Sequence, residues 1–262
     1  MEKQKDTAVL VVSFGSTHLD TLERCIEATE DVIAGEFAEY TMYRAFLSPT
    51  VMRRLKEEEG IFVDDVENAL KLIAHDGFHR VVVQPTLLLA GFEFDLLKNK
   101  LKTGADLDIT LGRVLIENEQ DCDVLADIIM EENPLKEGEA LVLMGHGTEH
   151  AANRVYPILQ KLFVEKHYNA VIGTVESTPT FEDAVEQVKA SGAVCAKLMP
   201  LMFVAGDHAK NDMAGDEADS LLSMMSAAGI HAEPILRGLG ESKAVQQLYA
   251  DRAKEALGGF MK

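Results

Sequence analysis

The sequence predicts an α/β protein made of two similar halves that face one another. The first observation is a repeat: residues 8–17 read AVLVVSFGST and residues 140–148 read ALVLMGHGT. A second repeat follows, because residues 85–93 read PTLLLAGFE and residues 200–208 read PLMFVAGDH. The third observation is that short aliphatic runs without polar alternation, typical of strands buried in a parallel sheet, take turns with segments of helical spacing.

The predicted elements follow that alternating order along the chain. Strands are expected at Ala8–Val12, Val81–Val83 with Thr86–Leu89, Leu141–Met144, Val171–Val175 and Ala196–Val204. Helices are expected at Leu19–Ala34, Val63–His75, Asp121–Glu131, Ala151–Lys166, Phe181–Ser191 and, as an amphipathic C-terminal helix, Ser242–Leu257. The polar stretch EENPLKEGE at 131–139 precedes the second copy. We therefore expect an N-terminal half at residues 1–134 and a C-terminal half at 135–262 that includes the last helix.

Composition excludes several classes of function. The chain has 262 residues, with 44 acidic against 25 basic side chains and a net charge of −19, and its longest basic cluster is Arg53–Arg54. This charge disfavours nucleic-acid binding and attracts divalent cations. We expect no membrane segment and no secretory leader, and hence a soluble, cytoplasmic protein. The absence of a P-loop and of a glycine-rich dinucleotide fingerprint makes nucleotide chemistry a weak interpretation.

The pattern of cysteines indicates neither a disulfide framework nor a thiolate metal site. Cys25, Cys122 and Cys195 are widely spaced and odd in number, so we expect buried, reduced thiols. The remaining candidates for chemistry stand at predicted strand ends.

His146 follows the run Leu141–Met144 and lies between two glycines, where the first copy has Phe14. The carboxyl ends of strands are where open α/β sheets bind ligands. The alternative is that the glycines only permit a tight turn while the imidazole bonds to a backbone carbonyl. For the motif G-H-G alone, both interpretations stay open.

Two more candidates stand at other strand ends. His208 takes the place that Glu93 has in the first copy, and Glu176 directly follows Val171–Val175. The alternative for His208 is that Asp207 caps a helix and the histidine is a bystander. Together, two imidazoles and one carboxylate suit Co²⁺, Fe²⁺, Ni²⁺ or Zn²⁺ better than Mg²⁺ or Ca²⁺. The predicted metal site is therefore His146, Glu176 and His208, with open coordination positions for a reacting ligand.

Three further residues are weighed around this site. Glu93 would face the same cleft from the other half, where a carboxylate accepts protons or holds a cation in transit. Arg44, expected to follow a strand, would offset an anionic ligand by bidentate pairing, although a surface ion pair explains it equally well. His150 is expected to face solvent or to support the site from behind.

The chain resembles a known family in motifs that run along its whole length and in order. These motifs are V-V-S-F-G-S at 11–16, Y-R-A-F-L-S at 43–48, M-G-H-G at 144–147, V-E-S-T-P at 175–179, L-M-P-L-M-F-V-A-G-D-H-A-K-N-D-M at 198–213 and G-L-G-E at 238–241. They resemble the anaerobic sirohydrochlorin cobaltochelatases, which belong with ferrochelatase to the class II chelatases. One departure is Phe92, where some members carry a smaller polar residue.

The resemblance implies a fold, a reaction and a set of residues. The fold would be two flavodoxin-like or Rossmann-like halves with an interdomain cleft. The reaction would be insertion of Co²⁺ into sirohydrochlorin with release of two protons, on the anaerobic route to cobalamin. The family's metal ligands fall on His146, Glu176 and His208, with His146 also as the base and Glu93 as a further catalytic carboxylate. No organic cofactor is implied, because Co²⁺ is a substrate.

The same resemblance requires a surface for an acidic macrocycle on an acidic protein. The side chains expected to support the ring are Phe14, Leu88, Leu89, Met202 and Phe203. Backbone N–H groups near Ser13, Gly15 and Ser16, together with Arg44, are expected to meet the carboxylates of the substrate.

Other functions stay open at this point. One is a chelatase that inserts Fe²⁺ or Ni²⁺ into a related tetrapyrrole, such as the precursor of sirohaem, because ligand types alone do not select the metal. Another is a non-enzymatic, two-lobed metal-binding protein, and a metallohydrolase is a more distant option. A homo-oligomer is compatible with the sequence, which does not decide the number of subunits.

Overall fold

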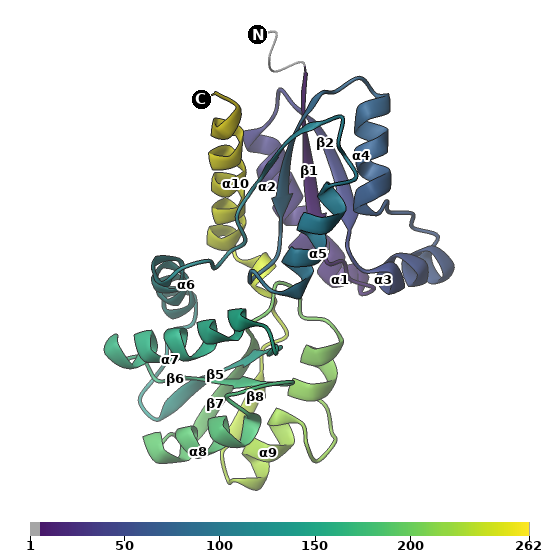
Figure 1. Cartoon of the computed structure of the whole chain (residues 1–262). Coiled ribbons are helices and arrows are strands. Elements are labelled where there is room, and N and C mark those ends of the chain that lie inside the picture. Colours follow the sequence, from purple (N-terminus) through teal and green to yellow (C-terminus); the bar gives the residue numbers. More distant parts are fainter. Residues whose placement is uncertain (1–5, 262) are drawn as a thin grey trace. The chain divides into compact units, whose positions relative to one another are not determined.

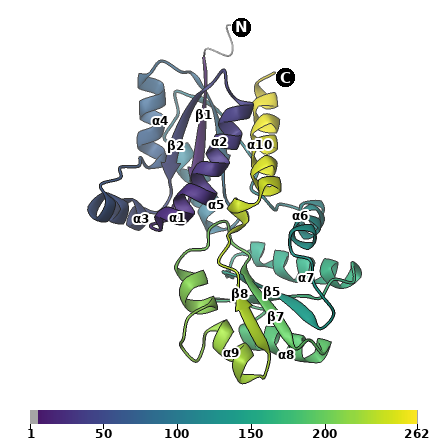
Figure 2. The ribbon, with the colours of Figure 1, turned by 180° about the vertical axis from the view of Figure 1, so that it is seen from behind.

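The computed structural model describes residues 6–261, and the chain divides into two compact units. Unit 1 combines Met1–Glu117 with Gly240–Lys262, and unit 2 is Asn118–Leu239. Each unit has a parallel four-stranded sheet with helices packed on it (Figures 1 and 2). The predicted α/β class is confirmed in both units.

The strands of unit 1 have the order β2-β1-β3-β4. They are β1 (Thr7–Ser13), β2 (Thr41–Phe46), β3 (Arg80–Pro85) and β4 (Asp108–Leu111). The helical segments are α1 (Leu19–Thr21), η1 (Leu22–Glu27), α2 (Ala28–Glu36), α3 (Pro49–Arg54), η2 (Leu55–Glu59), α4 (Val66–His75), α5 (Phe92–Leu101), α10 (Lys243–Gly258) and η6 (Gly259–Met261). All residues of β1 are buried, as its unbroken apolar run requires.

The strands of unit 2 repeat this arrangement in the order β6-β5-β7-β8. They are β5 (Glu139–Gly145), β6 (Ala170–Thr174), β7 (Cys195–Pro200) and β8 (His231–Pro234). The helical segments are α6 (Glu119–Glu132), η3 (Ala151–Arg154), α7 (Val155–Glu165), α8 (Phe181–Ser191), η4 (Ala209–Met213) and α9 (Leu221–Ala227), and η5 (Leu239–Glu241) stands where the chain returns to unit 1. The two sheets therefore have the same topology, and the repeated sequences occupy matching strands.

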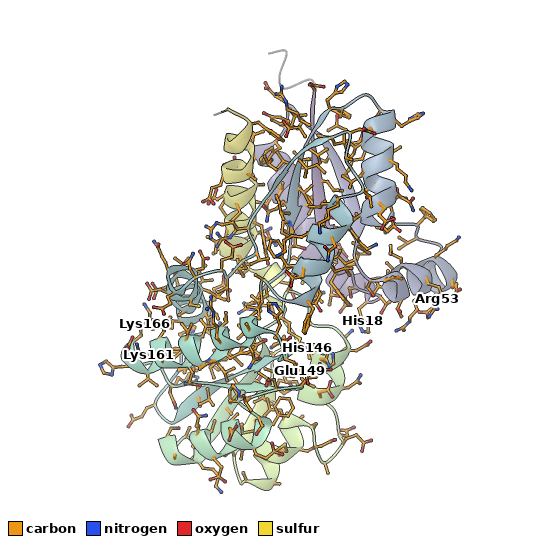
Figure 3. The ribbon with its side chains drawn as sticks, in the orientation of Figure 1. His18, Arg53, His146, Glu149, Lys161 and Lys166 are labelled. Atoms are coloured by element: carbon orange, nitrogen blue, oxygen red, sulfur yellow. The ribbon has the colours of Figure 1, made fainter. Side chains whose placement is uncertain are left out.

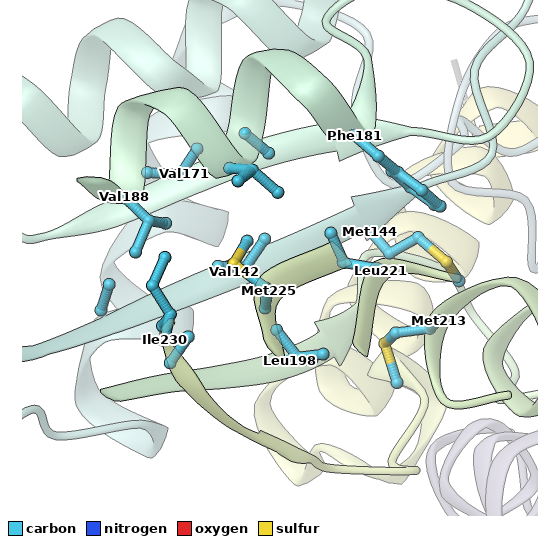
Figure 4. Packing of buried hydrophobic residues seen from close by; sticks show 14 of the residues in the cluster. Val142, Met144, Val171, Phe181, Val188, Leu198, Met213, Leu221, Met225 and Ile230 are labelled. Carbon is cyan, nitrogen blue, oxygen red and sulfur yellow. The ribbon is translucent and has the colours of Figure 1, made fainter. Parts of the chain in front are cut away.

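The core of unit 2 packs helices against its sheet. Figure 4 shows β5, β6 and β7 contributing Val142, Val171 and Leu198 to a cluster that α8 and α9 close from one side. Met144 and Met213 belong to the same buried cluster, so these methionines fill the core. The turns that carry the candidate site residues follow the buried strands β5, β6 and β7.

The units divide at other residues than the sequence predicts. The chain enters unit 2 before α6 instead of near residue 134, and α10 belongs to unit 1 instead of the C-terminal half. The reason is contact made by α10, which lies beside α2 in both views. Tyr249 donates a hydrogen bond to the Leu87 carbonyl at 3.1 Å, and Arg252 donates to the Leu115 carbonyl at 2.7 Å.

Two predicted strands are shorter in the structure. β3 and β7 end at Pro85 and Pro200, whereas the expected strands continue to Leu89 and Val204. Pro85 and Pro200 lack the N–H with which a residue donates to the ladder, although the residues that follow them, Thr86 and Leu201, each donate one more bond to the neighbouring strand. The short strands β4 and β8 and the helices α3, α5 and α9 are absent from the sequence-based prediction.

Local signals place the helix starts well. Side chains cap α4, α6, α8 and α10, and the capping residues are Asp65, Asn118, Thr180 and Ser242. Each satisfies a backbone N–H in the first turn that has no partner within the helix. Within residues 6–261, none of the helices has the length and apolar character needed to cross a bilayer.

Candidate functional site

The turn after β5 holds His146 in an exposed position. Gly147 adopts φ +82°, and a Cβ there would lie 2.8 Å from the backbone nitrogen of Ser177. The Gly147 N–H donates to the hydroxyl of Tyr156 at 3.3 Å, which anchors the turn on α7. His146 therefore projects from a turn whose backbone has little freedom, with 46% of its side chain exposed (Figure 3).

The hydrogen bond of His146 determines which ring nitrogen is free. Its Nδ1 lies 2.9 Å from the carbonyl oxygen of Gly147. A carbonyl only accepts, so Nδ1 carries the proton and Nε2 keeps a lone pair. The imidazole thus does bond to a backbone carbonyl, and this bond leaves Nε2 available to a proton or a metal ion.

Glu176 reaches the same place from β6. Its backbone N–H donates to the carbonyl oxygen of His146 at 2.9 Å, and Val175 donates to Gly145 at 3.1 Å. These bonds continue the pairing of β5 and β6 past the ends of both strands. The Glu176 carboxylate lies 3.6 Å from Nδ1 of His146, and 59% of its side chain is exposed.

His208 completes the cluster from the third strand. It follows β7 at the start of η4, and its ring stands edge-on to that of His146, with 4.7 Å between centroids and 88° between planes. Its Nδ1 lies 2.7 Å from Oδ2 of Asp212. A carboxylate accepts this bond, so Nδ1 of His208 also carries the proton and Nε2 is left free.

The three predicted ligands thus meet at the carboxyl ends of the adjacent strands β6, β5 and β7. In residues 6–261, no three His, Cys, Asp or Glu side chains are already arranged to hold a metal ion. In this cluster the Glu176 carboxylate lies beside Nδ1 of His146, whereas the free lone pair is on Nε2. Rotation of the exposed Glu176 side chain is needed before all three side chains share one ion.

The matching turn in unit 1 presents an aromatic ring instead. Phe14 is 48% exposed after β1, so it offers an apolar surface as predicted. Ser13 and Ser16 are buried, with their hydroxyls bonded to Thr86 and Thr21 at 2.7 Å, and Gly15 is buried between them. Burial leaves little of these residues accessible, so the expectation that their backbone N–H groups meet substrate carboxylates does not fit the structure.

Arg44 forms ion pairs with carboxylates of its own unit. It lies within β2, not after it, and its guanidinium forms a bidentate ion pair with Glu30 and a contact with Glu27 at 3.2 Å. Burial opposes the charge of Arg44, but these carboxylates raise its pKa overall. The predicted pairing with substrate carboxylates is therefore replaced by an ion pair within unit 1.

The other predicted residues lie near strand ends with mixed exposure. Leu88 and Leu89 follow β3 and are half-buried, and Leu88 accepts a backbone bond from Ile116 at 2.9 Å. Phe203 and Met202 are also half-buried, and Met202 packs against the core of unit 2. Glu93 is exposed in the first turn of α5, directly after β3, where unit 2 has His208 after β7.

Sequence reasoning overlooks two residues that support the cluster. Asp212 bonds to His208, and Tyr156 fixes the turn of His146. The spacing of four between His208 and Asp212 on a helix indicates the first contact, because side chains i and i+4 are neighbours. No comparable signal predicts Tyr156, which approaches the turn from α7.

The sequence matches the family model described as cobalt chelatase (CbiK) over residues 7–258. The sirohydrochlorin cobaltochelatase of Salmonella typhimurium is 35% identical over 253 residues, which are 95% of this chain and 96% of that protein. The sirohydrochlorin cobaltochelatase CbiKC of Nitratidesulfovibrio vulgaris is 28% identical over 255 residues, covering 95% of this chain and 90% of that one.

A solved structure shares the fold. SirB from Bacillus subtilis, determined with Fe³⁺, superimposes with a TM-score of 0.65 over 98% of both chains. The sequences are 15% identical in this alignment, so the likeness shows the two-unit fold alone.

Proposed function

The chain belongs to the cobalt chelatase (CbiK) family, and from this premise we propose that it inserts Co²⁺ into sirohydrochlorin with release of two pyrrole protons. The observation that carries the proposal is the meeting of His146, Glu176 and His208 at three adjacent strand ends of unit 2. As a member of this family the protein is a metal chelatase, and Co²⁺ is its substrate metal.

The metal side of the proposal uses the free nitrogen atoms of two imidazoles. In His146 and His208 the Nδ1–H groups are engaged, so each ring has a lone pair on Nε2. Glu176 adds an exposed carboxylate that has room to rotate toward them. Two neutral nitrogens and one oxygen hold Co²⁺ while leaving coordination positions for the ring nitrogens that replace them.

The proton side of the proposal follows from the same lone pairs. Insertion exchanges two N–H protons of the macrocycle for one divalent ion, so two protons must leave the ring. Nε2 of His146 serves the ion and the proton in turn: it binds Co²⁺ on arrival and accepts a proton once the ion has passed to the ring nitrogens. Glu93, exposed in unit 1, is the proposed acceptor of the second proton.

The remaining parts of the proposal concern the side chains that would contact the macrocycle, and the location, assembly and cofactor of the protein. Phe14, Leu88, Leu89 and Phe203 are the exposed or half-buried apolar side chains assigned to the macrocycle. Met202 is half-buried like Phe203 and packs against the core of unit 2, and it stays in this set as a proposal. We keep the cytoplasmic location, a homo-oligomer and the absence of an organic cofactor as predictions from the sequence.

The test is an anaerobic absorbance time course of sirohydrochlorin with Co²⁺. We expect the protein to accelerate formation of the cobalt complex over the spontaneous rate. His146→Ala should lower the accelerated rate by about 10²–10⁴-fold, which is the range for loss of a positioned base. The matched control is His231→Ala, which removes an exposed imidazole of the same unit at the start of β8 and should leave the rate unchanged.

Two results would contradict the proposal. Acceleration by His146→Ala equal to that of the unaltered protein would remove His146 from the chemistry. Absence of acceleration by the unaltered protein, with Co²⁺ still bound, would exclude sirohydrochlorin as the ring and favour another tetrapyrrole or a binding function.

A further inference from the structure

Asp212 is a carboxylate that the metal cluster does not itself require, yet it is bonded to one member of that cluster. We infer that Asp212 is a positioning residue, whose bond to Nδ1 of His208 holds the imidazole with Nε2 presented to the incoming Co²⁺. This inference rests on the proposed function of His208 as a metal ligand.

The geometry of the pair supports this role. Oδ2 of Asp212 lies 2.7 Å from Nδ1 of His208, within the usual range for a charge-assisted hydrogen bond. The two residues are four positions apart along the helical turns that start after β7, so they share one face. Histidine ligands of metals usually donate their other ring N–H to such a partner, which determines the tautomer and the ring orientation.

A role in stability alone does not account for the pair. The side chains of His208 and Asp212 are 39% and 41% exposed. Exposed pairs of this kind contribute about 0–1 kcal/mol to stability. The main consequence of the bond is therefore the state of the imidazole, because without a partner on Nδ1 the proton can move to Nε2 and the ring can rotate.

In His146, as in His208, Nδ1–H is hydrogen-bonded and Nε2 keeps its lone pair, but the partner differs. The Nδ1–H of His146 is held by the backbone carbonyl of Gly147, a partner that no side-chain substitution removes. The partner of His208 is a side chain, so the tautomer of this ring alone is open to mutation. The matching position in unit 1 is Leu97, four residues after Glu93 and fully buried in the core.

The experiment compares Asp212→Ala and Asp212→Asn with Asp216→Asn. The asparagine keeps an oxygen that accepts from Nδ1–H, whereas alanine removes the acceptor. Asp216→Asn removes an equal charge from an exposed residue four positions further along. Three quantities are measured: binding of Co²⁺ alone in the absence of any tetrapyrrole, kcat and KM for Co²⁺ in the insertion assay, and the urea midpoint.

For Asp212→Ala we expect the Kd and the KM for Co²⁺ to rise about 10- to 100-fold, which is the effect of removing such a supporting partner. Asp212→Asn should restore most of the affinity, and Asp216→Asn should behave like the unaltered protein. The urea midpoint should stay the same in all three variants. Co²⁺ binding by Asp212→Ala equal to that of Asp216→Asn would overturn the inference.

The variants His208→Ala and His208→Ala/Asp212→Ala separate this inference from the function on which it rests. If Asp212 acts through His208, the second substitution should add no further loss of Co²⁺ affinity to the first. A further loss in the double variant would overturn the positioning role. If His208→Ala binds and inserts Co²⁺ normally, the proposed ligand set itself is wrong, whatever Asp212 does.

Discussion

Unit 1 and unit 2 have the same strand order and the same backbone contacts at their strand ends, but they carry different side chains there. In unit 1 the Ser48 N–H donates to the Phe14 carbonyl at 3.2 Å, and in unit 2 the Glu176 N–H donates to the His146 carbonyl at 2.9 Å. The third strands match as well, because Thr86 donates to Val12 and Leu201 donates to Met144. The backbone of the repeat therefore supplies equivalent positions at these strand ends, and the side chains there differ.

The side chains at these positions serve different ends. Ser48 accepts from the Val51 N–H and so caps α3, whereas the chain after Glu176 continues to Thr180 before the next helix is capped. Unit 1 thus uses its position for folding, while unit 2 leaves an exposed carboxylate beside His146. At equivalent backbone positions, one half of the duplicated fold thus exposes an imidazole and a carboxylate, which are the proposed metal ligands, while the other exposes the ring of Phe14.

The largest expected effect comes from moving the imidazole between the units. The double variant Phe14→His/His146→Phe exchanges the two side chains, so that the imidazole follows β1 of unit 1 while Glu176 and His208 remain in unit 2. We expect an insertion rate as low as that of His146→Phe alone, about 10²-fold or more below the unaltered protein. Phe14→His alone should keep most of the rate, and the insertion assay compares all three. Recovery of activity in the double variant would show that the two units are interchangeable.

A second prediction concerns the glycine that each turn contains. Gly147 and Gly15 have φ of +82° and +102°, and an added Cβ would lie 2.8 Å from the Ser177 nitrogen and from the Phe46 ring, respectively. Alanine at either position should destabilise the protein by about 3 kcal/mol, because strain and a clash add together. The control Gly60→Ala, at φ +69° with open space around it, should cost about 1 kcal/mol.

Urea unfolding of these three variants makes the measurement. Similar losses for Gly147→Ala and Gly15→Ala would sharpen the comparison, since both turns would then depend equally on glycine. A loss at either turn no larger than that of Gly60→Ala would contradict the geometry.

The smallest expected effect concerns the ion pair between Arg44 and Glu30 in unit 1. Burial raises the pKa of Glu30 above its ordinary value of 4.5, although the bond to Arg44 opposes this shift. A raised folded-state pKa means that the contribution of Glu30 to stability is greatest below about pH 4.5 and falls as the pH rises through the folded-state pKa. Arg44→Ala removes the opposing bond and increases that loss.

We therefore expect Arg44→Ala to cost about 2 kcal/mol at pH 7 and less near pH 4, where Glu30 is mostly protonated in both states. Urea unfolding at the two pH values measures the difference, and Glu30→Gln/Arg44→Ala should show little pH dependence from this pair. The insertion assay should give an unchanged KM for sirohydrochlorin. If that KM rises while the stability is unchanged, Arg44 binds the carboxylates of the substrate after all.

Much of the fold was predictable because its signals are local. The bounds of α8 agree with the predicted Phe181–Ser191, since Thr180 caps its start and Gly192, at φ +75°, ends it. Elements with weak local patterns, such as the four-residue strands β4 and β8, were not predicted. The three ligand candidates were predictable for another reason: His146 and Glu176 come directly after apolar runs, His208 follows one through the short turn Ala205-Gly206-Asp207, and parallel strands bring such ends together.

The sequence by itself determined the duplicated α/β class, most of the longer strands and helices, and the positions of three candidate ligands near strand ends, because periodicity, glycine and capping residues act over a few positions. Only the tertiary structure decided that α10 returns to unit 1, that Glu30 occupies Arg44, and that Asp212 and Gly147 leave Nε2 free on both histidines. The first two depend on contacts between residues far apart in the chain, whose pairing follows from packing. The last depends on hydrogen-bond geometry, which spacing along the chain suggests but does not specify.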